Sequence, residues 1–380
     1  MRRRAAAGCA LALALAAPPA GAQEAGPGAA PDAAPDVACV VPAQTAAPGT
    51  PANLRELRRF ATGAGVRVAV IDTGVAPHPE LARLTPGAHF VGADSLTDCD
   101  GHGTVVAGII AGRTLGIAPG AEIISVRQTS SHYRGADAGN LQTLADAINA
   151  ALDAGARVLN LSVVSCVDPR IAPRIDASGL TTALRRAEAE GAVVVAAAGN
   201  AGPDCAPDSA VFPAQFPTVL AVAARDGDHA LAPYSLPADL SAPGAVPAAL
   251  SPSGAGWSSG TLTAQGGVAP YAGTSFAAPV VSGSVALLMS RYPGISPAHV
   301  RALVAAAAAP GGGAVDPLAV LTQLAPDPVA EGATLTVTPA DEVVSRAPAR
   351  LGAAAAALAA AALACTVAAA STSRSARPRG

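Results

Sequence analysis

The chain has 380 residues, of which 51% are hydrophobic, and a formal net charge of −3. This length allows one large hydrophobic core or two of ordinary size, and the order of the motifs below favours one. A charge so close to neutral offers no basic surface for phosphates, which excludes nucleic acid as an expected partner.

The N-terminus has the organisation of a secretory signal peptide. Residues 2–4 are arginines, an apolar run follows, and small residues at 20–22 precede Gln23. A basic, an apolar and a small-residue region in this order predict a signal peptide at residues 1–22 that is removed on export. The alternative, a cytosolic helix, does not explain the order of the three regions. The domain that follows is therefore expected outside the cytoplasm.

Residues 23–62 are expected to form an N-terminal extension. Up to about Thr50 they are rich in Pro, Ala and Gly, which gives an extended arm with little to build a core. Leu54, Leu57 and Phe60 then recur at helical spacing and predict one short docking helix. The segment is too short to bury a core of its own, so we expect it to wrap on the domain that follows.

Residues 63–309 alternate between short β-branched runs and helical patterns. The runs are of the kind buried in parallel sheets, and they predict strands at 66–72, 121–128, 156–163, 192–200 and 218–226. Helical periodicity predicts helices at 139–155, 180–191 and 296–308, the last with Ser296 as N-cap and Pro297 at its first position. The alternation predicts one α/β domain, with a mostly parallel sheet and helices on both faces.

Two candidate catalytic side chains lie in the first half of this domain. Asp72 ends the first predicted strand in VAVIDTG, and the carboxyl ends of parallel strands face the ligand crevice. His102 lies in CDGHGT between two glycines, which we expect to leave space around the imidazole. Taken singly, such an aspartate is more often a cap and such a histidine more often structural.

The third candidate, Ser275, lies in GTSFAAP where a helix of small residues begins. The N-terminus of a helix supplies a backbone N–H and a favourable dipole. We expect Pro279 in the first turn of this helix, where the missing N–H has no partner to lose. By itself, a serine at this place is an ordinary N-cap.

Together, the three candidates indicate a catalytic site more strongly than each does alone. A serine nucleophile needs a histidine to take its proton and an acid to orient that histidine. The order Asp, His, Ser is that of subtilisin, and VIDTG, DGHGT and GTSFAAP each resemble a motif of the subtilase family, within a span from residue 66 to about 308. The resemblance implies a subtilisin-like fold and a serine endopeptidase that cleaves proteins or peptides with Asp72, His102 and Ser275. No cofactor or metal is expected.

The same resemblance implies further site residues. VVVAAAGNAG is similar to the subtilase strand whose asparagine lines the oxyanion hole, which assigns Asn200 as a donor opposite the Ser275 N–H. The alternative is a turn cap before Gly202. Two segments, 130–137 and 160–166, would line a cleft in which an extended peptide adds a strand. The candidate cleft residues are Ser130, Ser131, Ser162, Val163 and Val164. The valines, in place of the glycines of many subtilases, predict a narrow pocket.

Four cysteines remain once Cys9 in the signal peptide and Cys365 near the C-terminus are set aside. In an exported domain they predict two disulfides, with three possible pairings. Metal binding is the alternative, but the four are far apart and no CxxC motif is present. They are Cys39, Cys99, Cys166 and Cys205.

The C-terminal part divides into a proline-rich linker at 310–350, an uncharged stretch at 351–370 and a basic tail at 371–380. Twenty helical residues span about 30 Å, the thickness of a bilayer core. The arginines that follow would stop an exported chain with its C-terminus in the cytoplasm. The stretch is mostly alanine, so by itself a solvated helix is the alternative. We expect a transmembrane helix at 351–370.

The short extension, the cysteine placement and the tail, with SVRQTS at 125–130, are similar to the mycosins, subtilases associated with type VII secretion in actinobacteria. The resemblance implies the pairs Cys39–Cys99 and Cys166–Cys205 and a stabilising arm. It also implies a membrane-held protease, with its catalytic domain extracytoplasmic, beside a type VII secretion complex. Two alternatives are a structural subunit of that complex with dispensable proteolysis and a freely secreted degradative protease.

Overall fold

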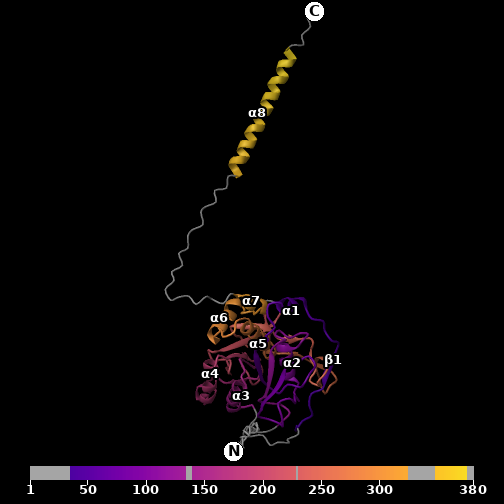
Figure 1. The fold of residues 1–380 in the computed structure, drawn as a ribbon, viewed down its shortest axis with the longest axis vertical. Coiled ribbons are helices and arrows are strands. Elements are labelled where there is room, and N and C mark those ends of the chain that lie inside the picture. Colours follow the sequence, from indigo (N-terminus) through magenta and orange to yellow (C-terminus); the bar gives the residue numbers. More distant parts are fainter. Residues whose placement is uncertain (1–34, 134–138, 228–229, 324–346, 375–380) are drawn as a thin grey trace, which may run out of the picture. The chain divides into compact units, whose positions relative to one another are not determined.

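A computed structural model of the chain describes residues 35–133, 139–227, 230–323 and 347–374 (Figure 1). The predicted signal peptide, most of the predicted linker and the end of the basic tail lie outside the described residues. The chain divides into two units, residues 1–325 and 326–380, and each is described by itself.

The first unit is built on an eight-stranded sheet whose central strands are parallel. In spatial order its strands are β10 (Ala230–Leu231), β9 (Val219–Asp226), β7 (Val193–Ala197), β5 (Val158–Leu161), β2 (Arg67–Asp72), β4 (Glu122–Arg127) and β3 (Leu84–His89), and β11 (Leu240–Pro243) also pairs with β9. Only β10 runs antiparallel to its neighbour among the pairs of this sheet in the described part of the chain. The five predicted strands are confirmed. Strand β3 was not predicted, because Pro86 and Gly87 interrupt its pattern.

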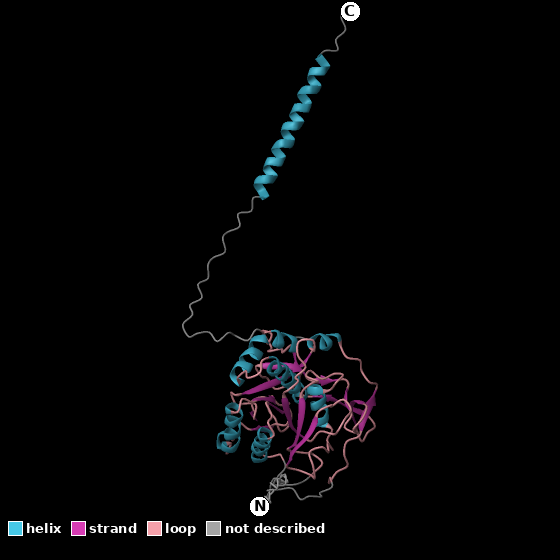
Figure 2. Ribbon diagram, viewed as in Figure 1, coloured by secondary structure: helices cyan, strands magenta, loops and turns pink. Residues whose placement is uncertain are grey.

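Both faces of the sheet are covered, as predicted (Figure 2). Side chains alternate along a strand, so Val68 and Val70 of β2 enter one core and Ala69 and Ile71 enter the other. Helices α2 (His102–Ala111) and α5 (Thr274–Arg291) supply the first core, and α3 (Leu141–Asp153) and α4 (Ser178–Ala189) supply the second. Two layers of helices therefore exclude water from the sheet that carries Asp72.

Local signals start the helices where the sequence predicts. The Ser296 side chain accepts a hydrogen bond from the backbone N–H of His299 at the start of α6 (Pro297–Ala307). The Asn140 side chain does the same for Thr143 at the start of α3, at 2.8 Å. Such a cap stabilises a helix by about 1 kcal/mol. A short 3₁₀-helix, Ala172–Arg174, precedes α4.

The N-terminal extension contains more regular structure than expected. Strand β1 (Pro42–Thr45) pairs antiparallel with β14 (Trp257–Leu262) in a five-stranded sheet completed by β12 (Ala245–Val246), β13 (Ala249–Leu250) and β15 (Val268–Ala272). Helix α1 (Ala52–Leu57) buries Leu54 and Leu57 as predicted. Phe60 is 49% exposed, because the helix ends before it and its side chain leaves the buried face.

The first part of the linker predicted at residues 310–350 is packed against the domain. Helix α7 (Pro317–Thr322) packs against α5 and α6, and its Val320 and Leu321 are fully buried. The backbone N–H of Ser241 also donates to the carbonyl of Gly313 at 2.7 Å. The glycines and prolines that suggested a spacer are thus the turns before this helix, and the packed unit extends to about residue 323.

The second unit contains helix α8 (Ala347–Arg374), which extends beyond the predicted stretch 351–370 at both ends. Within the described residues, no helix combines the length and the apolar character that crossing a membrane requires. The transmembrane helix expected from the sequence is therefore not confirmed.

Candidate active site

Asp72 and His102 meet where β2 ends and α2 begins. The imidazole Nδ1 of His102 donates to Oδ1 of Asp72 at 2.6 Å. The same oxygen accepts from the backbone N–H of Thr73 at 2.8 Å, and the Asp72 side chain is fully buried. A proton held on Nδ1 leaves the lone pair of His102 on Nε2, which is the tautomer of a general base.

The glycines beside His102 serve a different purpose from the one expected. A Cβ atom on Gly103 would lie 2.0 Å from the backbone oxygen of Gly74, in the turn after β2. Gly101 precedes α2 with φ of 71°, a conformation that other residues rarely adopt. The glycines therefore let the start of α2 approach the end of β2, which brings His102 to Asp72.

The surroundings of His102 favour its protonated form. Burial lowers the pKa of the imidazole, but the charge of Asp72, its hydrogen bond and the charges of Asp98 and Asp100 act in the other direction. The pKa of His102 is raised above its ordinary value as a result. Neighbouring carboxylates stabilise the imidazolium that forms when this side chain takes a proton.

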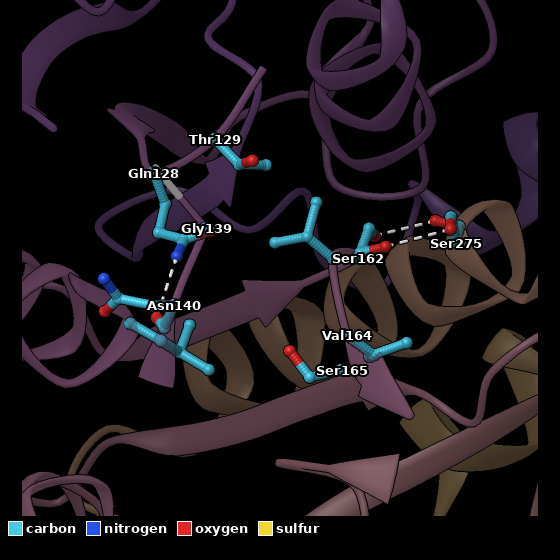
Figure 3. A pocket seen from close by; sticks show the side chains of 10 residues that line it. Gln128, Thr129, Gly139, Asn140, Ser162, Val164, Ser165 and Ser275 are labelled. Atoms are coloured by element: carbon cyan, nitrogen blue, oxygen red, sulfur yellow. Dashed lines mark hydrogen bonds between the residues drawn. The ribbon is translucent and has the colours of Figure 1, made fainter. Parts of the chain in front are cut away.

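Ser275 lies in the first turn of α5, one residue before a side chain that packs on His102. The ring of the next residue, Phe276, is 5.0 Å from the His102 ring between centroids. The Ser275 hydroxyl donates to the backbone oxygen of Ser162 at 2.9 Å, and the Ser162 hydroxyl donates to the backbone oxygen of Ser275 at 2.7 Å (Figure 3). Two segments far apart in the sequence thus hold each other at the site.

Pro279 lies inside α5, not in its first turn as the sequence suggested. A residue there would normally donate its N–H to the carbonyl four positions earlier, which is that of Ser275. Proline has no N–H, and the Ser162 hydroxyl donates to this carbonyl instead. The missing helical bond is therefore replaced by one that ties the strand segment to the serine.

Asn200, shortly after β7, lies beside the start of α5. Its Oδ1 accepts from the backbone N–H of Thr274 at 3.0 Å and from the Thr274 hydroxyl at 3.1 Å. Its Nδ2 lies 3.3 Å from the position that a Cβ on Gly273 would occupy. The two bonds to Oδ1 leave Nδ2 as the donating end of the amide, next to the Ser275 backbone.

A pocket of about 340 Å³ adjoins Ser275 (Figure 3). Of the predicted cleft residues it is lined by Ser162, Val163 and Val164. Its other lining residues are Gln128, Thr129, Gly139, Asn140, Leu144, Ser165 and Ser275. Segments 128–129 and 162–165 thus face each other across a space next to the serine, which is the geometry that an inserted peptide strand needs.

Ser130 and Ser131, also predicted to line the cleft, bind the carboxylate of Asp100. Their hydroxyls donate to the two oxygens of Asp100, each at 2.5 Å. Neither is among the residues that line the pocket. Asp100 belongs to the turn before His102, so these serines hold that turn in place.

The four cysteines form two disulfides, Cys39–Cys99 and Cys166–Cys205, which are the pairs that the resemblance implies. The first joins the N-terminal extension to the segment before His102. The second joins β6 (Ser165–Val167), which pairs with β8 (Ala210–Phe212), to the segment after Asn200. Each bond therefore supports a segment of the site. Within the described residues, no group of three His, Cys, Asp or Glu side chains is arranged to hold a metal ion.

Sequence reasoning missed Asp98 and Asp100 as parts of the site. Asp98 is buried and accepts hydrogen bonds from both sides of the Asp72–His102 pair. In the sequence the two acids stand in a turn-rich segment, where such residues are usually solvated. Their spacing of four and two residues before His102 is the only signal that could have singled them out.

Residues 63–346 match the subtilase family, peptidase S8. Mycosin-4 of Mycobacterium tuberculosis is 36% identical over 333 residues, which cover 77% of this chain and 72% of mycosin-4. Subtilisin BL of Lederbergia lenta is 34% identical over 252 residues, which cover 64% of this chain and 83% of that protein.

Solved structures of proteins from type VII secretion systems are also similar to this chain. MycP1 from the ESX-1 type VII secretion system is similar with a TM-score of 0.71 and 32% identity, covering 79% of this chain and 93% of MycP1. A chain of the intact ESX-5 inner membrane complex is similar with a TM-score of 0.70 and 32% identity, covering 92% of this chain and 97% of that one.

Proposed function

The chain belongs to the subtilase family of serine proteases, and from this we propose that it hydrolyses peptide bonds of exported proteins with Asp72, His102 and Ser275. The observation that carries the proposal is the 2.6 Å bond between buried Asp72 and His102, with Ser275 in the first turn of a helix whose next residue, Phe276, packs on the same imidazole. An acid, a base and a nucleophile in this relation are what acyl transfer requires.

In the proposed reaction, the Ser275 hydroxyl turns from Ser162 to His102. Nε2 of His102 takes the hydroxyl proton as the oxygen attacks the peptide carbonyl carbon. Asp72 keeps the imidazole oriented and stabilises its positive charge. The carbonyl oxygen becomes negative and accepts hydrogen bonds from Nδ2 of Asn200 and the Ser275 N–H. His102 then passes its proton to the leaving amine, and water hydrolyses the acyl-enzyme by the same steps.

Labelling with a fluorophosphonate tests this proposal, because the reagent reacts with an activated serine. The full chain should be labelled, and Ser275→Ala and His102→Ala should not. Thr274→Ser, which changes the residue next to Ser275 but retains its hydroxyl, is the matched control and should be labelled like the parent. Label that survives in Ser275→Ala would assign the nucleophile to another residue and overturn the proposal.

We further propose that the protease works at a type VII secretion membrane complex. The support is its similarity to MycP1 and to a chain of the ESX-5 inner membrane complex. Affinity purification of the tagged chain from membranes should recover the other subunits of such a complex. In cells, Ser275→Ala separates two functions: secretion that stops with cleavage requires proteolysis, whereas secretion that continues supports a chiefly structural role.

Export by residues 1–22 and membrane attachment by residues 351–370 also remain proposals. They rest on the basic, apolar and small-residue order of the N-terminus and on the uncharged stretch followed by arginines. Cell fractionation should place the full chain with membranes and a chain ending at residue 346 in the medium. Full-length protein in the medium would support a freely secreted protease instead.

A further inference from the structure

A second carboxylate, Asp98, lies beside the Asp72–His102 pair and takes no part in the proposed reaction. The residue is 8% exposed. Its Oδ1 accepts from the Thr73 hydroxyl at 2.8 Å and from the Gly101 backbone N–H at 2.9 Å. Its Oδ2 accepts from the Thr104 N–H at 2.8 Å and from the Thr104 hydroxyl at 2.6 Å. Four donors converge on one buried side chain.

These four bonds reach both partners of the pair. Thr73 follows Asp72 directly, while Gly101 and Thr104 stand on either side of His102. The Thr73 hydroxyl also accepts from the backbone N–H of Gly103 at 3.0 Å, and the Thr104 hydroxyl accepts from Ala76 at 2.9 Å. The carboxylate therefore ties the turn after β2 to the first turn of α2, which are the segments that carry the acid and the base.

The Thr73 hydroxyl lies between two carboxylates, 2.8 Å from Oδ1 of Asp98 and 3.2 Å from Oδ1 of Asp72. A hydroxyl has one proton to donate, and the shorter distance gives it to Asp98. Oδ1 of Asp72 is then left to the backbone N–H of Thr73 and to His102.

We propose that Asp98 is a positioning residue for the Asp72–His102 pair: its carboxylate fixes the two segments that carry them and adds negative charge beside the imidazole. This role deepens the proposed function and rests on it. An ionised carboxylate fits four donors because it has acceptors only. An amide in its place would turn its NH₂ group toward two of these donors.

The negative charges of Asp98 and its neighbours all raise the pKa of His102. Burial, with the charge of Asp72, raises the pKa of Asp98 to about 6 against its hydrogen bonds, so it is ionised at neutral pH. The negative charges facing His102 are those of Asp72, Asp98 and Asp100, and they raise its pKa. Burial and the charge of Asp98 also raise the pKa of Tyr271 in β15, so this phenol is neutral around neutral pH.

NMR titration of the His102 imidazole in a Ser275→Ala background tests the charge without requiring activity. Asp98→Asn should move the His102 midpoint to lower pH, because one of three facing negative charges is lost. Asp94→Asn is the matched control, since Asp94 is an exposed acid that also accepts bonds within its own turn. In Asp94→Asn the His102 midpoint should equal that of the parent. An unchanged midpoint in Asp98→Asn would overturn the proposal.

Kinetics on the chain with Ser275 intact tests the positioning. Asp98→Asn should lower kcat by about 10- to 100-fold and leave KM nearly unchanged, because a catalytic group misplaced by about 1 Å can cost 100-fold. A rise in KM with kcat unchanged would contradict the proposal. If hydrolysis by the parent does not depend on Ser275, the proposed function fails, while the titration still decides the effect of Asp98 on His102.

Replacements of Thr73 keep the proposal testable if Asp98→Asn does not fold. Thr73→Val removes the hydroxyl that joins the Asp72 turn to Asp98, and kcat should fall by about 10-fold. Thr73→Ser restores the hydroxyl and should recover most of that loss. Equal losses in the two variants would show that the hydrogen bond to Asp98 does not position the pair.

Discussion

Ser275 and Ser162 exchange two hydrogen bonds, each hydroxyl donating to the backbone oxygen of the other residue, at 2.9 and 2.7 Å. The first bond must break before Ser275 can donate to His102. Breaking it frees the Ser162 carbonyl, at the edge of the pocket, to accept an N–H from an extended peptide. In the proposed reaction, substrate binding and activation of Ser275 are therefore linked through Ser162.

Replacing Ser162 with alanine should destabilise the domain. The Ser275 carbonyl loses its donor, and the side-chain amide of buried Asn160, which donates to Ser162 at 2.8 Å, loses its acceptor. An unsatisfied buried polar group costs about 1–3 kcal/mol, so urea unfolding should show a loss of this size. Ser165→Ala in the same pocket is the control and should stay within about 0.5 kcal/mol of the parent. If Ser162→Ala is as stable as the parent, the hydrogen bonds of the Ser162 hydroxyl contribute nothing to stability.

Activity should fall on the acid side at a pH above the ordinary histidine value. His102 must be unprotonated at Nε2 to act as a base, and its raised pKa keeps it protonated to higher pH. The midpoint of kcat/KM should therefore lie above about 6.5. Below pH 6, protonation of Asp98, whose pKa is about 6, adds a second loss and steepens the limb. A one-proton limb with its midpoint under 6.5 would contradict both shifts.

Two replacements of Asn200 separate its donor from its acceptor. Asn200→Ala removes both and should lower kcat by about 100- to 1,000-fold with little change in KM, the usual cost of losing one oxyanion donor. Asn200→Asp keeps an acceptor for Thr274 but offers no N–H to the oxyanion, so its loss should be at least as large. Activity retained in Asn200→Asp would show that the residue only holds Thr274.

The sequence predicted the central strands and the helix that carries Ser275 because their patterns are local. A β-branched run ending in Asp72 and a helix beginning near Ser275 each follow from neighbouring residues. Strand β1 could not be predicted in this way, because residues 42–45 become a strand only by pairing with β14, some 215 positions later. The role of Asp98 likewise depends on donors from two segments that only the fold brings together.

Removing either disulfide should lower stability, but only loss of Cys166–Cys205 should weaken substrate binding. Cys39–Cys99 closes a span of 60 positions and Cys166–Cys205 one of 39, so removing either as a double serine variant should cost about 2–5 kcal/mol. The turn before His102 remains held by Asp98 without the first bond, so kcat should change by less than about threefold. Without the second, β6 at the pocket edge loosens and KM should rise while kcat falls less. Thermal unfolding and steady-state kinetics on both variants measure these effects. A large fall in kcat on loss of Cys39–Cys99 would show that the N-terminal extension, rather than the buried carboxylate, holds the general base.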